Sequence, residues 1–275
     1  MAITNAIPEI WSAKILEEFR QKAIFAGLAN REYEGEAKQG SSVHITGISP
    51  IIIKDYKAAG RVTNPDEVTD TGIILPIDNE KSFDFIVDDI DAAQAKPRLL
   101  NAYSKSAGEG LVEDADKTLA ALLIAQGTAV TPAAPATDGA TAWNVIRDIK
   151  KAMAKAKVPA SERVLVFNAE FAALLDENDS KLMKANESAT TAGLRNASYG
   201  KILTFDTYES ENLPQVTVPQ VVGFHRSALA YASQIDKTEA MRAQSKFGDR
   251  LRGLHVYGAK NLRPDAVFHW TAAVV

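Results

Sequence analysis

The sequence has no cysteine, few aromatic residues and no long apolar run. With 275 residues and not one cysteine, it excludes disulfide bonds, thiolate nucleophiles and zinc sites built on cysteine. No stretch approaches the roughly 20 consecutive apolar residues of a membrane-spanning helix. The first ten residues lack the basic and apolar regions of a signal peptide. We therefore expect a protein that works in a cytosol, or in something assembled there, without contact with a membrane.

The residue patterns that usually carry chemistry are also missing. The formal net charge is −4, so no general attraction to nucleic acid or acidic membranes is expected. The four histidines, His44, His225, His255 and His269, stand in no HExxH pair or other two-histidine helical spacing. Neither a G-x-S-x-G nucleophile elbow nor a phosphate-binding glycine loop with its lysine occurs. The sequence predicts no enzyme activity, no metal site and no cofactor.

The strongest positive pattern is a long helix, from about residue 97 to residue 126. Apolar side chains recur there at steps of three and four, which places them on one stripe of a helix. Charged residues, Asp116 among them, fall on the opposite face and are expected in water. Two glycines, Gly108 and Gly110, favour a bend or a break near the middle, because each costs about 1 kcal/mol relative to alanine. A helix of this length, roughly 45 Å, needs something to lie against.

A shorter helix is predicted near the N-terminus, over residues 9–25, with Gly27 as its stop. Its apolar residues recur at every fourth position: Trp11, Ile15, Phe19 and Ala23. Trp11 has two interpretations that the sequence does not separate. It packs in the core of its own chain, or it belongs to an arm that buries its apolar stripe on a neighbouring subunit.

Two strand-like runs follow, over residues 42–56 and 72–87, and flank a polar segment rich in Gly, Asn, Pro and Asp. They predict a long two-stranded β-ribbon with a wide tip. An isolated ribbon is only marginally stable in water, so this one is a candidate for packing on another molecule. Four aspartates crowd the exit from the second run, and we expect them at the solvated start of the long helix: Asp84, Asp88, Asp89 and Asp91.

The remainder predicts a mixed α/β region and then strands. An amphipathic helix is expected over residues 141–157, a buried strand over 163–167, and a helix over 169–175 that Asn168 caps. A polar loop over residues 176–196 is long for a compact domain. Strands are then expected at three places: residues 201–208, residues 218–224 and the last fifth of the chain.

Three stretches carry a resemblance to a known family. They are IPEIWS (7–12) leading to LANR (28–31), YGKILTFDTYESENLP (199–214), and the FGD to VYG stretch (247–258) continuing to Pro264. In these motifs and in its order of elements the chain resembles the major capsid proteins of tailed bacteriophages with the HK97-type fold. The middle stretch is similar to the family's G-x-I-x-G-F-x-V-Y-x-S-N-N-L-P segment, with Thr204 in place of the usual glycine and Glu211 in place of the first asparagine.

The resemblance implies an α+β, HK97-like capsid fold in five parts. These would be an N-terminal arm (1–40), an E-loop β-ribbon (41–90), a first part of the P-domain with the spine helix (91–157), an A-domain (158–225), and the closing strands of the P-domain (226–275).

The resemblance also implies a function and partners. The chain would self-assemble as pentamers and hexamers into the icosahedral head of a virion, around double-stranded DNA that it binds without sequence specificity. Assembly would take place in the host bacterial cytoplasm. A start at the arm favours a separate scaffolding protein, with a portal and a decoration protein as further candidate partners. The expected subunit contacts are Trp11 in the arm and four residues of the ribbon: Ile51, Ile53, Tyr56 and Arg61.

Three other functions stay open at this point. An encapsulin-like compartment shell resembles the same fold and holds cargo enzymes. An α/β enzyme would use the 158–225 region with the ribbon as a lid, and would need a pocket with converging polar groups. A non-shell interaction protein would form rings only.

Overall fold

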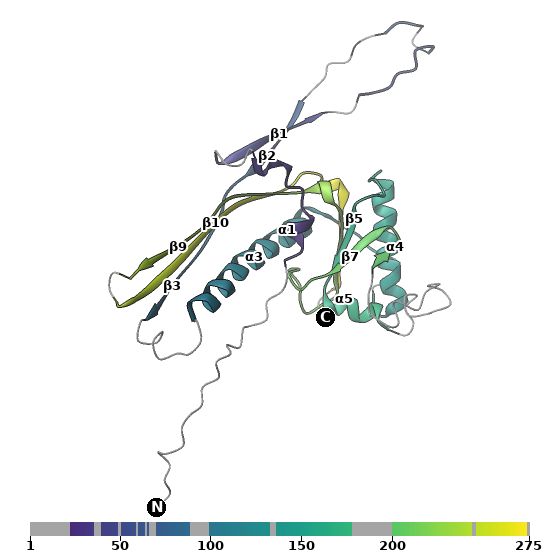
Figure 1. Ribbon diagram of the computed structural model, residues 1–275. Coiled ribbons are helices and arrows are strands. Elements are labelled where there is room, and N and C mark those ends of the chain that lie inside the picture. Colours follow the sequence, from purple (N-terminus) through teal and green to yellow (C-terminus); the bar gives the residue numbers. More distant parts are fainter. Residues whose placement is uncertain are drawn as a thin grey trace, which may run out of the picture.

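A computed structural model places a two-part body beneath a projecting β-ribbon (Figure 1). It describes residues 23–35, 40–48, 51–58, 60–63, 65, 70–88, 99–132, 136–177, 200–243 and 246–273. Several predicted features lie outside these residues, namely Trp11 and most of the N-terminal helix, Asp89 and Asp91, and most of the 176–196 loop.

The long predicted helix is present as α3, Leu99–Gln126. It is continuous through Gly108 and Gly110, so the break that those glycines favoured does not occur. The helix ends at Gln126, at the predicted position, and the N–H of the following Gly127 donates to the Leu123 carbonyl at 2.8 Å. A Cβ at Gly127 would come within 2.6 Å of that same carbonyl, so a side chain there would force the backbone to move.

A three-stranded antiparallel sheet lies along α3 and gives the helix its support (Figure 1). Its order is β3 (Asn79–Asp88), β10 (Gly248–Asn261) and β9 (Leu229–Arg242). The Phe85 ring lies 6.0 Å from the Tyr103 ring of the helix, and the Tyr257 hydroxyl donates to the Thr118 hydroxyl at 3.1 Å. Lys81 of β3 forms an ion pair with a helix carboxylate, Asp114, at 3.2 Å.

The second part of the body is a six-stranded mixed sheet in the order β4-β11-β8-β5-β7-β6. Its strands are β4 (Thr128–Ala129), β5 (Arg163–Phe167), β6 (Lys201–Ile202), β7 (Phe205–Glu209), β8 (Gln220–His225) and β11 (Val267–Thr271). All five residues of β5 are buried. The sheet brings β4 and β11, which the sequence division gave to the P-domain, beside strands of the 158–225 region.

Two helices pack on this sheet, and their caps explain where they start. In α4, Gly139–Lys155, the Asp138 side chain accepts from the Thr141 N–H while the Thr141 hydroxyl accepts from the Asp138 N–H, which is a capping box. In α5, Ala169–Leu175, the Asn168 side chain accepts from the Phe171 N–H, as predicted.

The ribbon consists of β1 (Ser42–Ile48) and β2 (Asp70–Pro76), paired over seven residues. The expected single strand over residues 72–87 is wrong, because the chain leaves the ribbon after Pro76 and enters the other sheet as β3. The Pro76 carbonyl lies so close to Gly258 of β10 that a Cβ there would approach it to 2.4 Å. The strand predicted over 42–56 likewise ends early, at Ile48.

Two other local predictions are corrected. The strand predicted over 201–208 is a tight hairpin of β6 and β7, with Leu203 at a positive φ of 56° between them. Ala23 and Ile24 are not helical and Gly27 lies inside the short helix α1, Phe25–Leu28, so Gly27 is no helix stop.

Candidate assembly surfaces

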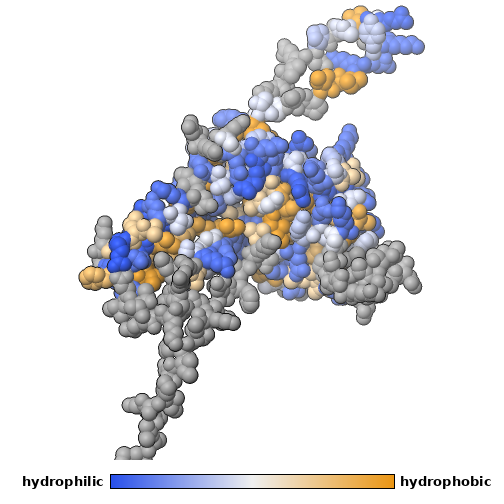
Figure 2. All heavy atoms as spheres, in the orientation of Figure 1, coloured by the Kyte–Doolittle hydropathy of each residue, from blue (hydrophilic) through white to orange (hydrophobic). Residues whose placement is uncertain are grey.

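The ribbon carries an apolar surface that its own chain leaves uncovered. Ile51 and Ile53, predicted as contacts, are 73% and 90% exposed, and the Ile52 between them is 72% exposed. Figure 2 shows apolar side chains on the projecting ribbon, away from the body. Large apolar side chains gathered on one exposed element mark a surface for another protein.

The tip of the ribbon is a formed turn. The Asp55 carboxylate accepts from the N–H groups of Lys57 and Ala58, at 2.9 and 3.2 Å, and the Arg61 N–H donates to the Tyr56 carbonyl at 2.9 Å. Arg61 has a positive φ of 64°, an uncommon conformation for a residue with a side chain. The structure thus brings two predicted contact residues, Tyr56 and Arg61, onto one turn.

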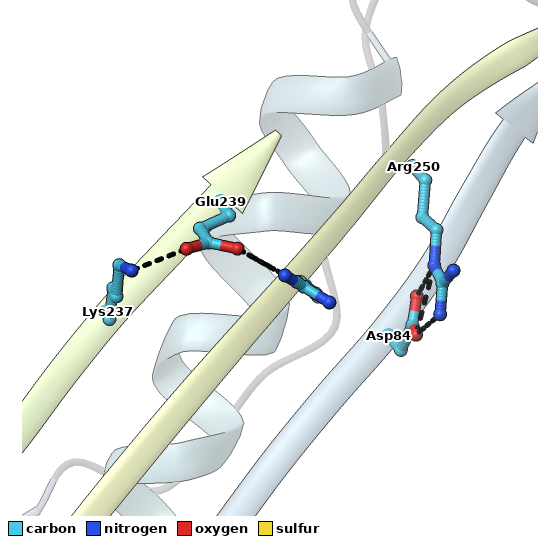
Figure 3. A network of polar contacts seen from close by, with 5 residues as sticks. Asp84, Lys237, Glu239 and Arg250 are labelled. Atoms are coloured by element: carbon cyan, nitrogen blue, oxygen red, sulfur yellow. Dashed lines mark hydrogen bonds and ion pairs between the residues drawn. The ribbon is translucent and has the colours of Figure 1, made fainter. Parts of the chain in front are cut away.

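The face of the three-stranded sheet turned away from α3 carries ion pairs (Figure 3). Arg250 of β10 binds both carboxylate oxygens of Asp84, and Glu239 of β9 accepts from Lys237 and from Arg252. The sequence placed Asp84 at the start of the helix. That expectation is wrong, because Asp84 lies in β3 with a strand partner.

These ion pairs lower the pKa values of both acids. Hydrogen bonds from Lys237 and then from Arg252 lower the pKa of Glu239 to about 2, and the hydrogen bond from Arg250 lowers the pKa of Asp84. The side chains of these groups are between 33% and 67% exposed, and ion pairs this accessible to solvent contribute little to stability. The network therefore defines the charge pattern of this face more than it holds the fold together.

A buried carboxylate fixes the root of the N-terminal arm. Asp116 of α3 is fully buried and accepts from the backbone N–H groups of Ile24 and Ala26, at 3.0 and 3.1 Å, and from the Asn212 side-chain amide at 2.8 Å. Beside it, the Phe25 ring stacks on Phe224 with centroids 6.2 Å apart. One side chain thus joins the arm, the long helix and a loop of the six-stranded sheet.

The sequence placed Asp116 on the solvent face of the helix, and the structure corrects this. Its donors lie 90 or more residues away in the chain, so no local pattern predicts them. Sequence reasoning also missed the 83% exposed Phe247, next to the hairpin of β9 and β10. The sequence signal that could have identified Phe247 as an exposed residue is an aromatic side chain that stands alone in a polar stretch.

Clusters of metal-binding side chains are not found in the part of the chain that the structure describes. No group of three or more His, Asp or Glu side chains there could hold a metal ion. Within the same residues, no helix is both long and apolar enough to cross a membrane.

The described chain thus combines a long helix along one sheet, a second sheet with its own helices, and a projecting ribbon with exposed apolar side chains. The sequence profile of a family described as "Phage capsid protein" matches residues 80–270. A chain of Mycobacterium phage Che8 is 47% identical, over 98% of both chains, with a TM-score of 0.91. The chain belongs to the phage capsid protein family.

Two more distant structures share the fold. A chain of the capsid of Cyanophage P-SCSP1u has a TM-score of 0.77 at 16% identity, over 100% of this chain and 95% of its own. A virus-like particle from Pyrococcus furiosus has a TM-score of 0.56 at 14% identity, over 84% and 86%. Among curated protein sequences none matches.

These findings confirm the HK97-like capsid fold and the function that the resemblance implied. The protein is a major capsid protein of the tailed-phage type, with copies of itself as partners and the virion as its location. Membership of a family of capsid structural proteins implies a structural role and not an enzymatic one.

Proposed function

We propose that this chain assembles as pentamers and hexamers into the icosahedral head of a tailed phage and encloses double-stranded DNA without sequence-specific contacts. The observation that carries the proposal is the likeness to the Che8 chain, which extends over 98% of both chains and so includes the arm and the ribbon. Assembly takes place in the host cytoplasm, with a separate scaffolding protein, a portal and a decoration protein as further partners.

We assign parts of the molecule to roles in the shell. Residues 1–40 form the arm, 41–90 the E-loop, 91–157 and 226–275 the P-domain, and 158–225 the A-domain. The sheet pairing supports the reassignment of three strands. β3 pairs with β10 and so joins the P-domain, whereas β4 and β11 join the sheet of the A-domain.

Contacts between subunits are assigned to Trp11 in the arm and to Ile51, Ile53, Tyr56 and Arg61 in the ribbon. The support for the ribbon residues is their exposure on an element that projects from the body. Burial of apolar surface yields roughly 25 cal/mol per Å², so exposed isoleucines repeated on every subunit supply a substantial drive to associate.

An encapsulin-like compartment is the second candidate function. The observation that favours it is the likeness to the Pyrococcus furiosus particle, at a lower TM-score than the phage chains. Nucleic acid inside the particles supports the phage head, whereas a cargo enzyme inside them supports the compartment.

Negative-stain electron microscopy of the purified protein, together with light scattering, tests the proposal. Closed shells, tubes, or rings with five- and six-fold symmetry are the expected result. A protein that stays monomeric even after the candidate scaffolding protein is added would contradict it.

A further inference from the structure

An open groove lies between the first half of α3 and the three-stranded sheet. Its volume is about 780 Å³. The helix wall runs from Ser104 to Ala115, and the sheet wall includes Phe83 of β3 and His255 of β10. The groove therefore follows the helix for about three turns.

The two halves of α3 differ in how far they are covered. In the second half, Leu119 and Leu123 are completely buried. In the first half, Tyr103 is 55% exposed and Val112, which lines the groove, is 46% exposed. A half-exposed apolar side chain in the groove wall, Val112, leaves room for another segment to cover it.

The residues that connect the N-terminal arm to the body lie beside this groove. Ala23 and Ala26 both line it. The N–H groups of Ile24 and Ala26 are held by Asp116, one residue beyond the end of the helix wall. Residues 1–22 thus join the described chain at the groove itself.

The sequence of residues 1–22 contains an apolar stripe of the kind that would cover the helix wall of the groove. Trp11, Ile15 and Phe19 repeat at every fourth position, and the next member of the series is Ala23, a residue of the groove wall. As a helix, residues 11–19 would measure about 12 Å, whereas the wall from Ser104 to Ala115 measures about 17 Å. The stripe fits the helix wall in length, and its apolar side chains match Leu111, Val112 and Ala115 of that wall.

We propose that, in the unassembled subunit, the apolar stripe of residues 11–19 docks in the groove of its own chain. The short tether from Ala23 gives the stripe a high effective concentration at its own groove, well above that of any free copy in dilute solution. This inference deepens the role proposed for the arm. The stripe stays covered in the free subunit and becomes available to a neighbour only when the shell forms.

The absence of cysteine from the chain allows a direct test. Ile15→Cys is combined with Val112→Cys in the groove or, as a matched control on the same helix, with Lys117→Cys, which does not line it. In dilute, disassembled subunits under mild oxidation, the groove pair should form an intrachain disulfide about tenfold faster than the control pair.

Two results would overturn the proposal. Equal rates for the two pairs would show that the stripe does not dock in the groove. Covalent dimers that join an Ile15→Cys chain to a Val112→Cys chain, together with no intrachain disulfide in the double variant, would show that the groove holds a neighbour's arm. Electron microscopy of the reduced variants tests shell formation separately, so failure of this inference is distinguishable from failure of the proposed function.

A second measurement does not depend on disulfide geometry. Alkylation of the single cysteine in Val112→Cys should be slow when the arm covers the groove. Adding Phe19→Asp should raise that rate about fivefold, because a carboxylate loses hydration when it packs against the apolar residues of the helix wall, Leu111, Val112 and Ala115. An unchanged rate contradicts the proposal.

Discussion

The ribbon and the six-stranded sheet use the same kinds of apolar residue in opposite ways. In the sheet, every residue of β5 is buried, and Gly223 of β8 lies so close to Ile149 that a Cβ would approach its side chain to 2.7 Å. In the ribbon, Ile51 and Ile53 are more than 70% exposed. Strand β5 therefore leaves no apolar side chain in water, whereas the ribbon buries Val43 and Leu75 and leaves its isoleucines at residues 51–53 exposed.

This difference separates stability from assembly within one chain. Burial in the sheet stabilises the subunit before any neighbour arrives. The exposed isoleucines on the ribbon do not stabilise the free subunit. They contribute hydrophobic stabilisation only when another copy of the chain covers them. Substitutions in the two regions should therefore change different measurements. The predictions below are ordered by their expected effect on the free energy of unfolding of the isolated subunit.

The largest effect is expected from Phe171→Ala in α5. Phe171 is completely buried and its ring lies 5.9 Å from that of Phe167 and 6.1 Å from that of Trp270. Removing it should lower the free energy of unfolding by about 3–5 kcal/mol, through lost burial and the cavity left behind. Denaturant unfolding of the subunit measures this. A loss below about 1 kcal/mol would mean that the site collapses around the gap.

The next largest effect is expected from Asp116→Asn, which acts where the arm, the helix and the six-stranded sheet meet. The new amide turns a donor toward a backbone N–H or toward the Asn212 amide, so a buried donor loses its acceptor. We expect a loss of about 2 kcal/mol. Hydrogen exchange should show faster exchange at the amides of Ile24 and Ala26.

Asp114→Asn is the matched control for Asp116→Asn. Asp114 lies two residues earlier on the same helix, but its side chain is 44% exposed and pairs with Lys81. Its replacement should cost less than about 1 kcal/mol, as for other surface ion pairs. Equal losses in the two variants would contradict the role given to Asp116.

The burial of Asp116 also shows which features of the structure the sequence can predict and which it cannot. The buried strand over 163–167, the Asn168 cap and the end of the long helix at Gln126 depend on neighbours in sequence, and all three are confirmed. Asp116 depends on donors about 90 residues away, so periodicity placed it wrongly in water.

The strand partners could not be predicted for the same reason as the burial of Asp116. The pairing of β11 with β8 and β4, and the transfer of β3 to β10, join segments that are distant in the chain. No hydrophobic pattern specifies such partners. The exposed contact residues of the ribbon were predicted because a ribbon with few neighbours has nothing of its own to cover them. Whether they touch a neighbour stays a prediction.

Ile53→Asp should leave the isolated subunit almost unchanged and still prevent assembly. Ile53 is 90% exposed, so its replacement should change the free energy of unfolding by less than about 0.5 kcal/mol. In the shell the same carboxylate would be buried without a partner, so particle yield by light scattering should fall at least about tenfold. Ala58→Asp, also at the exposed tip, adds the same single negative charge and is the control. Full assembly of Ile53→Asp would remove Ile53 from the contact surface.

The smallest effect is expected from the ion pairs on the outer face of the three-stranded sheet. The pKa of Glu239 is lowered from 4.5 to about 2 by Lys237 and Arg252, so the folded state favours the charged carboxylate. Its contribution to stability is therefore complete above pH 4.5 and is lost as the pH falls toward 2.

Comparison of the wild type with Glu239→Gln across this pH range tests the assignment. The wild type should be slightly the more stable at pH 7, and the two unfolding curves should converge as the pH falls through about 2, where the carboxyl group of the folded wild type becomes protonated. Because the groups are exposed, added salt should also reduce the difference at pH 7. Glu209→Gln, at an exposed site in β7, provides the comparison for loss of charge alone. A difference that persists unchanged at pH 2 would show that Glu239 acts through packing and not through its ion pairs.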